Sequence, residues 1–277
     1  MPVDSSLAYL EKLRAAQERN ASWLCVGLDP QPDRLPVQAL KWDEPILPFN
    51  KAIIEATADL VCAYKPNLGF YLQWGAAGII ALERTIAYIP GHLPVIVDCK
   101  TGDIGHTQAA WATGLLDYWG VDAITVNPYV GAEAVLPVIG RRPDKAVYLL
   151  ARTSNPSATD FQGDLAHCEG LSAEVIRQSQ DWPVQGHTGY VVGATYPEEL
   201  AMARRLAPQA NFLIPGIGAQ GGKLEPAVLH GPDPVAGPLI SASRSVIYAS
   251  AGENFAEAAR EAAIQFRDQI NQVRQSI

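Results

Sequence analysis

Short apolar segments alternate with amphipathic ones from about Ser22 to the end of the chain. This alternation is typical of repeated βα units, in which parallel strands are buried and helices cover them. We expect eight strands, at residues 23–28, 63–66, 95–100, 123–127, 146–152, 189–194, 212–215 and 239–243. The clearest amphipathic segments are residues 49–61, 75–89, 104–119, 198–206 and 255–273. The pattern predicts an α/β fold, a (β/α)8 TIM barrel, with a doubly wound open sheet as the alternative.

The length of 277 residues suits one such barrel, which typically needs about 250 residues. We find no composition break or internal repeat, so residues 1–277 are expected to form a single domain. Leucines recur at helical spacing within residues 5–19, which predicts an extra N-terminal helix. We expect this helix, within residues 1–21, to cover the bottom of the barrel. Residues 30–48 carry five prolines and are expected to form a long ordered loop.

Composition excludes several classes of function. Hydrophobic residues make up 48% of the chain and charged residues 18%, which is typical of a globular protein. A formal net charge of −8 disfavours nucleic acid and anionic membranes as partners, because both select basic surfaces. No apolar run approaches the roughly 20 residues of a membrane helix, and the N-terminus lacks the layout of a secretory signal. The expected location is cytoplasmic.

No metal or redox site is indicated by the sequence. The four cysteines, Cys25, Cys62, Cys99 and Cys168, are far apart and form no C-x-x-C pair. Free cysteines in apolar surroundings behave as small hydrophobic residues, so we expect them to pack. The five histidines form neither H-x-H nor H-E-x-x-H.

Charged residues stand where the predicted strands end. Asp29 follows the first strand, Lys65 lies near the end of the second, and Asp98 and Lys100 lie near the end of the third. Buried barrel strands are almost wholly apolar, and the active sites of barrel enzymes form at the carboxyl ends of the strands. Residues two apart on a strand point to the same side, so Asp98 and Lys100 should both face the barrel mouth. Their structural alternative is a buried ion pair.

Asp103 is predicted to open the helix that follows the third strand. A carboxylate there can cap free backbone N–H groups, which is its structural alternative to a functional role. Thr107 lies four residues later and therefore on the same helical face.

The loops after the last two strands are suited to hold a phosphate. The first runs Pro215-Gly216-Ile217-Gly218-Ala219-Gln220-Gly221-Gly222, and Arg244 follows the eighth strand. Glycines let backbone N–H groups approach an anion, and barrel enzymes commonly bind phosphate after strands 7 and 8. A guanidinium adds a fixed charge and a planar fork of donors. Tight turns are the structural alternative for the glycines, but their position favours a phosphomonoester ligand.

Three blocks of sequence resemble one known family. The run Asp98-x-Lys100-x-x-Asp103-Ile104-x-x-Thr107, with Lys65 upstream and the Pro215 to Gly222 run downstream, closely resembles orotidine 5'-phosphate decarboxylase. The chain looks most like the longer bacterial branch of that family. The resemblance extends from Asp29 to about Tyr248 and thus covers nearly the whole predicted barrel.

The resemblance implies conversion of orotidine 5'-phosphate to UMP and CO2 in pyrimidine biosynthesis, without a metal or organic cofactor. It implies that Lys65, Asp98, Lys100 and Asp103 form a catalytic charged network, in which Lys100 protonates C6 of the ring. The substrate-binding residues implied are Asp29, Thr107, Ser154, Pro215, Gln220 and Arg244. Asp29 and Lys65 would serve the ribose, Ser154 the pyrimidine, and Gln220 and Arg244 the phosphate. Asp103 and Thr107 would act across a homodimer interface.

Ser243 is a departure from the family, because many relatives have glycine before the phosphate-binding arginine. The sequence is also compatible with two alternative functions. One is a related barrel that decarboxylates or condenses a sugar phosphate through a Mg²⁺-bound enediolate; such enzymes place an acidic ligand near the end of strand 2, where this chain has Lys65, Pro66 and Asn67. The other is a barrel that binds nucleotides without catalysis.

Overall fold

The computed structural model describes residues 8–162, 170–217 and 221–276. Within them, eight parallel strands form one sheet in the order β2-β1-β8-β7-β6-β5-β4-β3. The strands are β1 (Leu24–Leu28), β2 (Ala63–Pro66), β3 (Ile96–Thr101), β4 (Ala123–Val126), β5 (Ala146–Arg152), β6 (His187–Val192), β7 (Phe212–Ile214) and β8 (Leu239–Ala242). Two isolated bridges, Tyr64 to Val95 and Asn67 to Asp98, join β2 to β3. The sheet therefore closes into a (β/α)8 barrel, which confirms the predicted fold over the open sheet.

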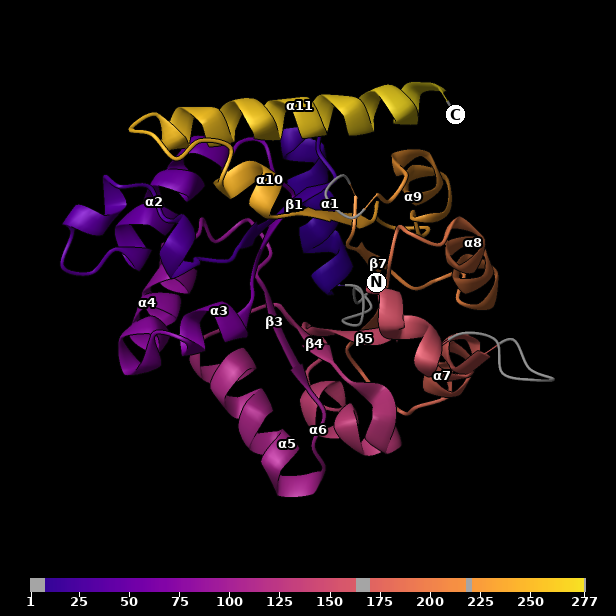
Figure 1. Cartoon of the computed structure of the whole chain (residues 1–277). Helices are drawn as coiled ribbons and strands as arrows, with labels where there is room; N and C mark the ends of the chain where they lie inside the picture. The colour runs from indigo at the N-terminus through magenta and orange to yellow at the C-terminus, as the bar shows by residue number, and fades with distance from the viewer. Residues whose placement is uncertain (1–7, 163–169, 218–220, 277) are drawn as a thin grey trace.

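Helices surround the strands (Figure 1). The α-helices are α1 (Ala8–Asn20), α2 (Ile46–Thr57), α3 (Leu68–Leu72), α4 (Gly75–Tyr88), α5 (Gly105–Ala112), α6 (Leu136–Ile139), α7 (Gly170–Gln180), α8 (Pro197–Leu206), α9 (Leu224–His230), α10 (Arg244–Ile247) and α11 (Phe255–Ser276). Shorter 3-10 segments are η2 (Pro32–Arg34), η3 (Ala39–Lys41), η5 (Pro128–Ala134) and η6 (Pro156–Asp160), and η4 (Thr113–Tyr118) is a π-helix.

The predicted elements differ from the observed ones mainly at their ends. The strand predicted at 189–194 begins two residues earlier, at His187, because polar His187 and Thr188 pair with β5. The helix predicted over 104–119 begins at Gly105 and widens into the π-helix after Ala112. Helix α7 and the short helices α3, α6, α9 and α10 were not predicted from the sequence. The proline-rich loop contains η2 and η3, and α2 begins within it at Ile46.

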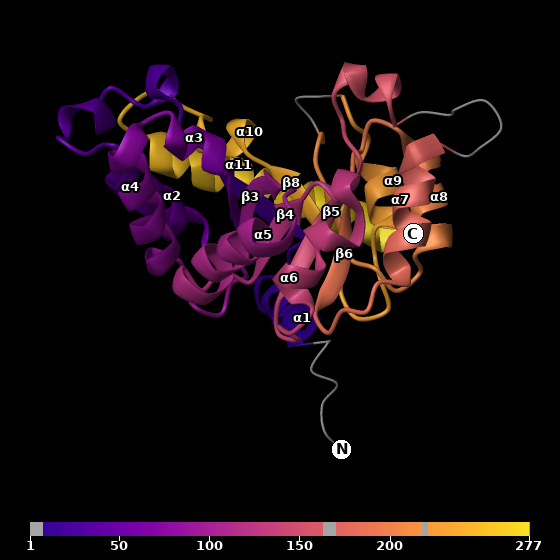
Figure 2. The same cartoon turned by 90° about the horizontal axis from the view of Figure 1, so that it is seen from below.

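The N-terminal helix α1 lies at the opposite end of the barrel from α3 and α10 (Figure 2). Its residues Tyr9, Leu10 and Leu13 are buried with interior residues of the strands. Gln17 adds hydrogen bonds to Gly237, donating to its carbonyl at 2.9 Å and accepting from its N–H at 2.8 Å. The expected helix is thus present and packs against the barrel bottom; its predicted first residues, 5–7, lie outside the described part of the chain.

The described cysteines are unpaired, as the packing interpretation expects. Cys25 and Cys62 are buried, and Cys99 is partly buried. Burial raises the pKa of the Cys25 thiol to about 12 and that of Cys99 to about 11, so both are neutral thiols at physiological pH. Cys168 lies outside the described residues.

A polar network joins α1 to the barrel bottom. The hydroxyls of Tyr9 and Tyr148 are 3.0 Å apart, and Tyr148 donates to the Asn211 side chain at 2.7 Å. The Asn211 backbone N–H donates to Nε2 of His187 at 3.2 Å. Burial lowers the pKa of His187 to about 4, although Asp233 opposes the shift. His187 is therefore neutral in the folded protein at neutral pH, and its imidazole serves as a hydrogen-bond acceptor.

We predict that this histidine makes the protein sensitive to mild acid. Because the folded-state pKa of His187 lies below its unfolded-state value, its contribution to stability is complete above about pH 6.5 and is lost as the pH falls toward 4. The His187→Gln variant should lose less unfolding free energy than the wild type over this range, by about 1 to 3 kcal/mol. Urea unfolding at several pH values measures the difference, and the same substitution at exposed His106 is the control. Equal pH dependence in the wild type and His187→Gln would contradict the prediction.

Candidate active site

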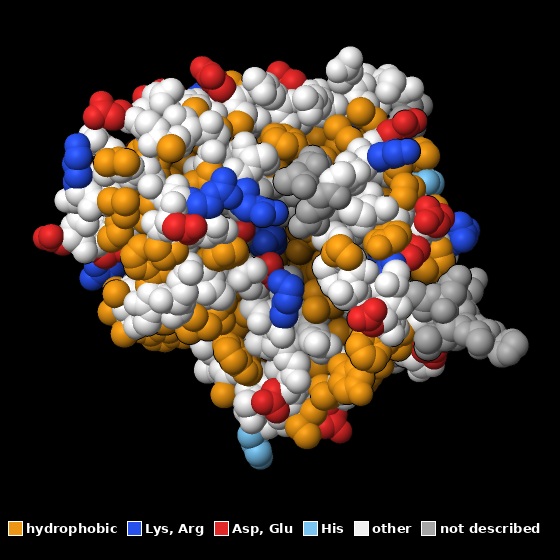
Figure 3. Space-filling model, in the orientation of Figure 1, with side chains coloured by type: hydrophobic (Ala, Val, Ile, Leu, Met, Phe, Trp, Pro, Cys, Tyr) orange, Lys and Arg blue, Asp and Glu red, His pale blue; other side chains and the backbone are white. Residues whose placement is uncertain are grey.

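A cavity of about 410 Å³ opens at the carboxyl ends of the strands. In the space-filling view, Lys and Arg side chains gather around a hollow near the centre of this face (Figure 3). The described residues that line the cavity come from all eight strands or from the segments that follow them. They include Asp29, Gln31, Lys65, Asn67, Phe70, Asp98, Lys100, Thr125, Leu150, Thr153, Ser154, Asn155, Val191, Leu213, Pro215, Gly216, Ile217, Ser241, Ala242, Ser243, Arg244 and Ser245.

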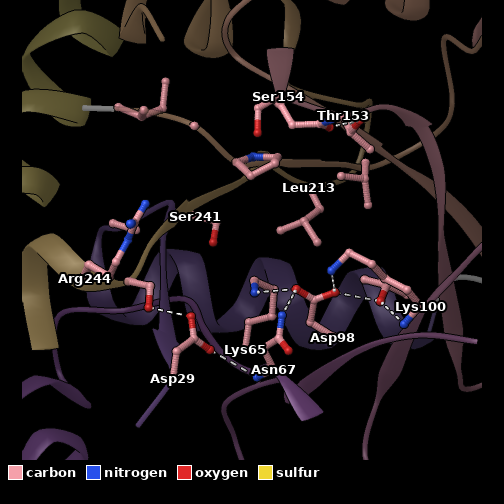
Figure 4. A pocket seen from close by; sticks show the side chains of 18 of the residues that line it. Asp29, Lys65, Asn67, Asp98, Lys100, Thr153, Ser154, Leu213, Ser241 and Arg244 are labelled. Carbon is pink, nitrogen blue, oxygen red and sulfur yellow. Dashed lines mark hydrogen bonds and ion pairs between the residues drawn. The ribbon is translucent and has the colours of Figure 1, made fainter. Parts of the chain in front are cut away.

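The Asp98 carboxylate lies between two lysines (Figure 4). Its Oδ2 accepts hydrogen bonds from Nζ of Lys65 and Nδ2 of Asn67, both at 3.1 Å. Its Oδ1 accepts from Nζ of Lys100 at 2.5 Å and from the Thr125 hydroxyl at 2.9 Å. Strands β2, β3 and β4 therefore meet at one carboxylate, and the predicted pairing of Asp98 with Lys100 is observed.

Asp98 and Lys100 lie where the pairing of β3 with β4 is irregular. Val97 pairs with Ile124 and Thr101 pairs with Val126, so β3 places three residues opposite the single residue Thr125 of β4. Within the irregularity, Lys100 has a φ of 46°, in the left-handed region that residues other than glycine rarely adopt. Simple strand alternation correctly predicted the shared direction of Asp98 and Lys100, but the backbone that carries them is not a regular strand. Backbone strain of this kind concentrates at functional sites.

Electrostatics keep the buried members of the cluster charged. Burial by itself would raise the pKa of Asp98, but Lys65 and Lys100 hold it well below its usual range. Burial by itself would lower the pKa of Lys65, yet Asp98 and Asp29 raise it above its usual value. Asp98 is thus an anion and Lys65 a cation at neutral pH. The side chain of Lys100 is 46% exposed, compared with 9% for Lys65, so its ammonium is open to the cavity.

Asp29 is fixed by the strands on both of its sides. Its Oδ1 accepts the backbone N–H of Asn67 at 3.2 Å, and its Oδ2 accepts the Ser243 hydroxyl at 2.6 Å. A Cβ at Gly27 would lie 2.7 Å from Cβ of Ser243, so the glycine makes room for the serine. Ser243 therefore orients Asp29.

Arg244 and Ser154 lie away from the Asp98 cluster. Arg244 follows β8, and Figure 4 shows it apart from Lys100, with Asp29 and Lys65 between them. Ser154, which follows β5, lies across the cavity from Asp98. Pro215 also lines the cavity, whereas Gln220 lies outside the described residues. The predicted phosphate and ring positions are therefore separated along the cavity.

Asp103 and Thr107 do not line the cavity of their own chain. Both are exposed, and Oδ1 of Asp103 accepts the backbone N–H of the next residue, Ile104, at 2.8 Å. Ile104 occupies the N-cap position of α5, so Asp103 lies just before the helix and does not open it as predicted. Its carboxylate satisfies a donor just before the first turn.

Two polar residues of the site were missed by the sequence analysis as functional candidates. Asn67 lies two residues after Lys65, and the same alternation that linked Asp98 with Lys100 could have identified it. Thr125 is a polar residue within the otherwise apolar strand Ala123–Val126, and it is 1% exposed. A hydroxyl in a buried strand needs a partner, which is the signal that could have drawn attention to it.

Comparisons with known proteins agree on one family. The model of the orotidine 5'-phosphate decarboxylase / HUMPS family matches residues 22–262. An orotidine 5'-phosphate decarboxylase of Thermomicrobium roseum is 48% identical over 276 residues, which cover 98% of each chain. The structure of Leishmania donovani OMP decarboxylase is 35% identical, with a TM-score of 0.82 over 96% of this chain and 98% of that one. Leishmania donovani UMP synthase is 37% identical with a TM-score of 0.83; the match covers 95% of this chain but 56% of that longer chain.

We predict that the Asp98 charge is needed for stability. The Asp98→Asn variant keeps the shape but leaves buried Lys65 close to a second cation, which should cost about 3 kcal/mol of unfolding free energy. Lys100→Met should cost less than about 1 kcal/mol, because the ammonium is half-exposed. Urea unfolding at pH 7.5 compares the two variants. The prediction is wrong if Asp98→Asn is as stable as Lys100→Met.

Proposed function

The chain belongs to the orotidine 5'-phosphate decarboxylase / HUMPS family, and we propose that it removes the carboxylate of orotidine 5'-phosphate to give UMP and CO2. The enzyme is a carboxy-lyase of pyrimidine biosynthesis. The observation that carries the proposal is the Asp98 carboxylate held between Lys65 and Lys100 at the mouth of the barrel. A fixed set of alternating charges can stabilise the charge that develops during decarboxylation more than the charge of the substrate.

Lys100 is the proton donor of the proposed reaction. The bond between C6 of the pyrimidine and the carboxylate breaks, CO2 leaves, and the electron pair stays on C6. The Lys100 ammonium stabilises this carbanion and transfers a proton to it, which forms the C6–H bond of UMP. Solvent then restores the proton to Lys100. Asp98 lies beside the departing carboxylate and is ionised throughout, since its pKa is held well below the usual range.

The remaining residues bind the other parts of the nucleotide. Asp29 and Lys65 bind the ribose hydroxyls. Asp29 is held by Ser243 and Lys65 by Asp98, so both side chains are in position before the substrate binds. Ser154, across the cavity, serves the pyrimidine. Pro215, Gln220 and Arg244 serve the phosphate, for which a guanidinium is the natural partner. The assignment is supported by the position of Asp29, Lys65, Ser154 and Arg244 around one cavity (Figure 4).

We propose a homodimer in which Asp103 and Thr107 act in the neighbouring subunit's site. Both residues are exposed and outside their own cavity. Apolar side chains are exposed along the same segment, with Trp111 at 39% and Tyr118 at 75%. A groove on this helix is lined almost wholly by apolar atoms of Thr107, Ala110, Trp111, Gly114, Leu115, Tyr118 and Trp119. A contiguous exposed apolar patch of this kind marks an interaction surface.

The two alternative functions are less well supported. A Mg²⁺-dependent barrel needs an acidic ligand near the end of β2, but Lys65 and Asn67 occupy that position and both donate to Asp98. Among the residues that the structure describes, no group of three or more His, Cys, Asp or Glu could hold a metal ion. A barrel that only binds nucleotides would not need the strained backbone that aims Lys100 into the cavity.

The proposal also includes the domain organisation and the cellular location. Residues 1–277 act as one domain, and the enzyme is cytoplasmic, where a charged nucleotide substrate is available. No described helix has the length and apolar character to span a bilayer.

The decisive test is an ultraviolet assay with orotidine 5'-phosphate. The wild type should consume the substrate equally well with and without EDTA, because no step of the proposal uses a metal. Turnover that EDTA abolishes and Mg²⁺ restores would favour the sugar-phosphate type of barrel. No turnover despite tight UMP binding would favour the non-catalytic alternative.

We predict that Lys100→Ala lowers kcat by at least about 1,000-fold, since it removes the proton donor. UMP binding, measured by calorimetry, should remain appreciable because the phosphate residues are intact. Lys41→Ala is the matched control, because Lys41 is exposed in η3 and absent from the cavity lining. Near-normal kcat in Lys100→Ala would overturn the assignment of the proton donor.

Hybrid dimers test the shared site. Lys100→Ala and Asp103→Ala chains should each be inactive alone, whereas a mixed dimer should contain one site with an intact Lys100 and an intact Asp103 from the partner. Random exchange of equal amounts should therefore restore about one quarter of wild-type activity. Mass spectrometry verifies that the subunits have exchanged. If activity then fails to recover, the result would argue against a site shared between subunits.

A further inference from the structure

Thr125 of β4 makes hydrogen bonds to both ends of the Asp98 to Lys100 segment. Its hydroxyl is 2.9 Å from the backbone N of Lys100 and 2.9 Å from Oδ1 of Asp98. The side chain is buried, at 1% exposure. These contacts link it to the catalytic residues of the proposed function, on which the following inference rests.

The need for this hydroxyl arises from the irregularity of β3. Three residues of β3 stand opposite the single residue Thr125, so the regular ladder between the strands is interrupted there. The Lys100 N–H bonds to the threonine side chain, and an unpaired buried backbone donor would cost free energy. The hydroxyl thereby supports a lysine whose φ of 46° is unfavourable by itself.

The direction of each hydrogen bond follows from the chemistry of the groups. A backbone N–H can only donate, so the Thr125 oxygen accepts from Lys100 and its single proton is free to point at Asp98. Oδ1 of Asp98 also accepts from Nζ of Lys100 at 2.5 Å. The hydrogen bonds therefore form a closed ring that runs from the Lys100 backbone through Thr125 and Asp98 to the ammonium of the same lysine. This ring fixes the ammonium relative to its own main chain.

We propose that Thr125 is a positioning residue for decarboxylation, which holds Lys100 in its left-handed conformation and orients Asp98 through one shared hydroxyl. It acts through these two residues and transfers no proton to the substrate. Its loss should therefore lower kcat while KM changes little, because the groups assigned to the phosphate and ribose stay in place. A displacement of a catalytic group by about 1 Å can cost about 100-fold in rate.

Three substitutions separate the hydroxyl from the shape of the side chain. Thr125→Val has the same shape without the hydroxyl and should lower kcat by about 100-fold with KM within about threefold of the wild type. Thr125→Ser keeps the hydroxyl and should keep kcat within about threefold, as loss of one buried methyl affects mainly stability. Thr57→Val is the control, because Thr57 is a buried threonine of α2 that donates to Ile53 outside the cavity; its kcat should equal that of the wild type.

The readouts are kcat and KM in the ultraviolet assay, UMP affinity by calorimetry, and urea unfolding for each variant. Thr125→Val with kcat within threefold of an active wild type would overturn the inference, and so would an equal loss in Thr125→Ser. Absence of turnover in the wild type would instead refute the proposed function. If Thr125→Val does not fold, Thr125→Cys takes its place, since a thiol is a weak donor; it should lose kcat where Thr125→Ser does not.

Discussion

The arrangement of the site depends on one buried carboxylate. Asp98 can stay ionised away from water only because two ammonium groups and two neutral donors surround it. These partners come from β2, β3 and β4, so the requirement to neutralise one charge draws three strand ends together. The seam between β2 and β3 is joined by isolated bridges, one of which is Asn67 to Asp98. The charge cluster therefore lies at the point where the barrel closes.

Strain and chemistry coincide in β3. A regular strand would present Asp98 and Lys100 with ordinary backbone geometry, whereas the observed strand gains residues relative to β4 and turns Lys100 into the left-handed region. Such a conformation persists only when its surroundings determine it, and here Thr125 and Asp98 do so. The lysine assigned as proton donor is held by both its main chain and its side chain, which suits a group that must be in place before the reaction.

The two ends of the barrel differ in the purpose of their polar groups. At the bottom, Tyr9, Tyr148 and Asn211 form a network that attaches α1, and neutral His187 completes it. At the mouth, the ionised pair of Asp98 and Lys65 lines an open cavity. This division matches barrel enzymes in general, where the N-terminal face serves stability and the C-terminal face carries the active site.

The sequence determined the barrel and the residue types of the site, because strand and helix periodicity and charges at strand ends are local properties. It placed Asp29, Lys65, Asp98 and Lys100 at one face, since parallel strands end together. It could not reveal the irregularity of β3 or the roles of Thr125 and Ser243, which depend on what each strand meets in its neighbour. The helix after β3 was expected to open at Asp103 but begins at Gly105, because a helix start shifts with its packing. Tertiary structure decided these points, since hydrogen bonds between strands satisfy groups that are distant in sequence.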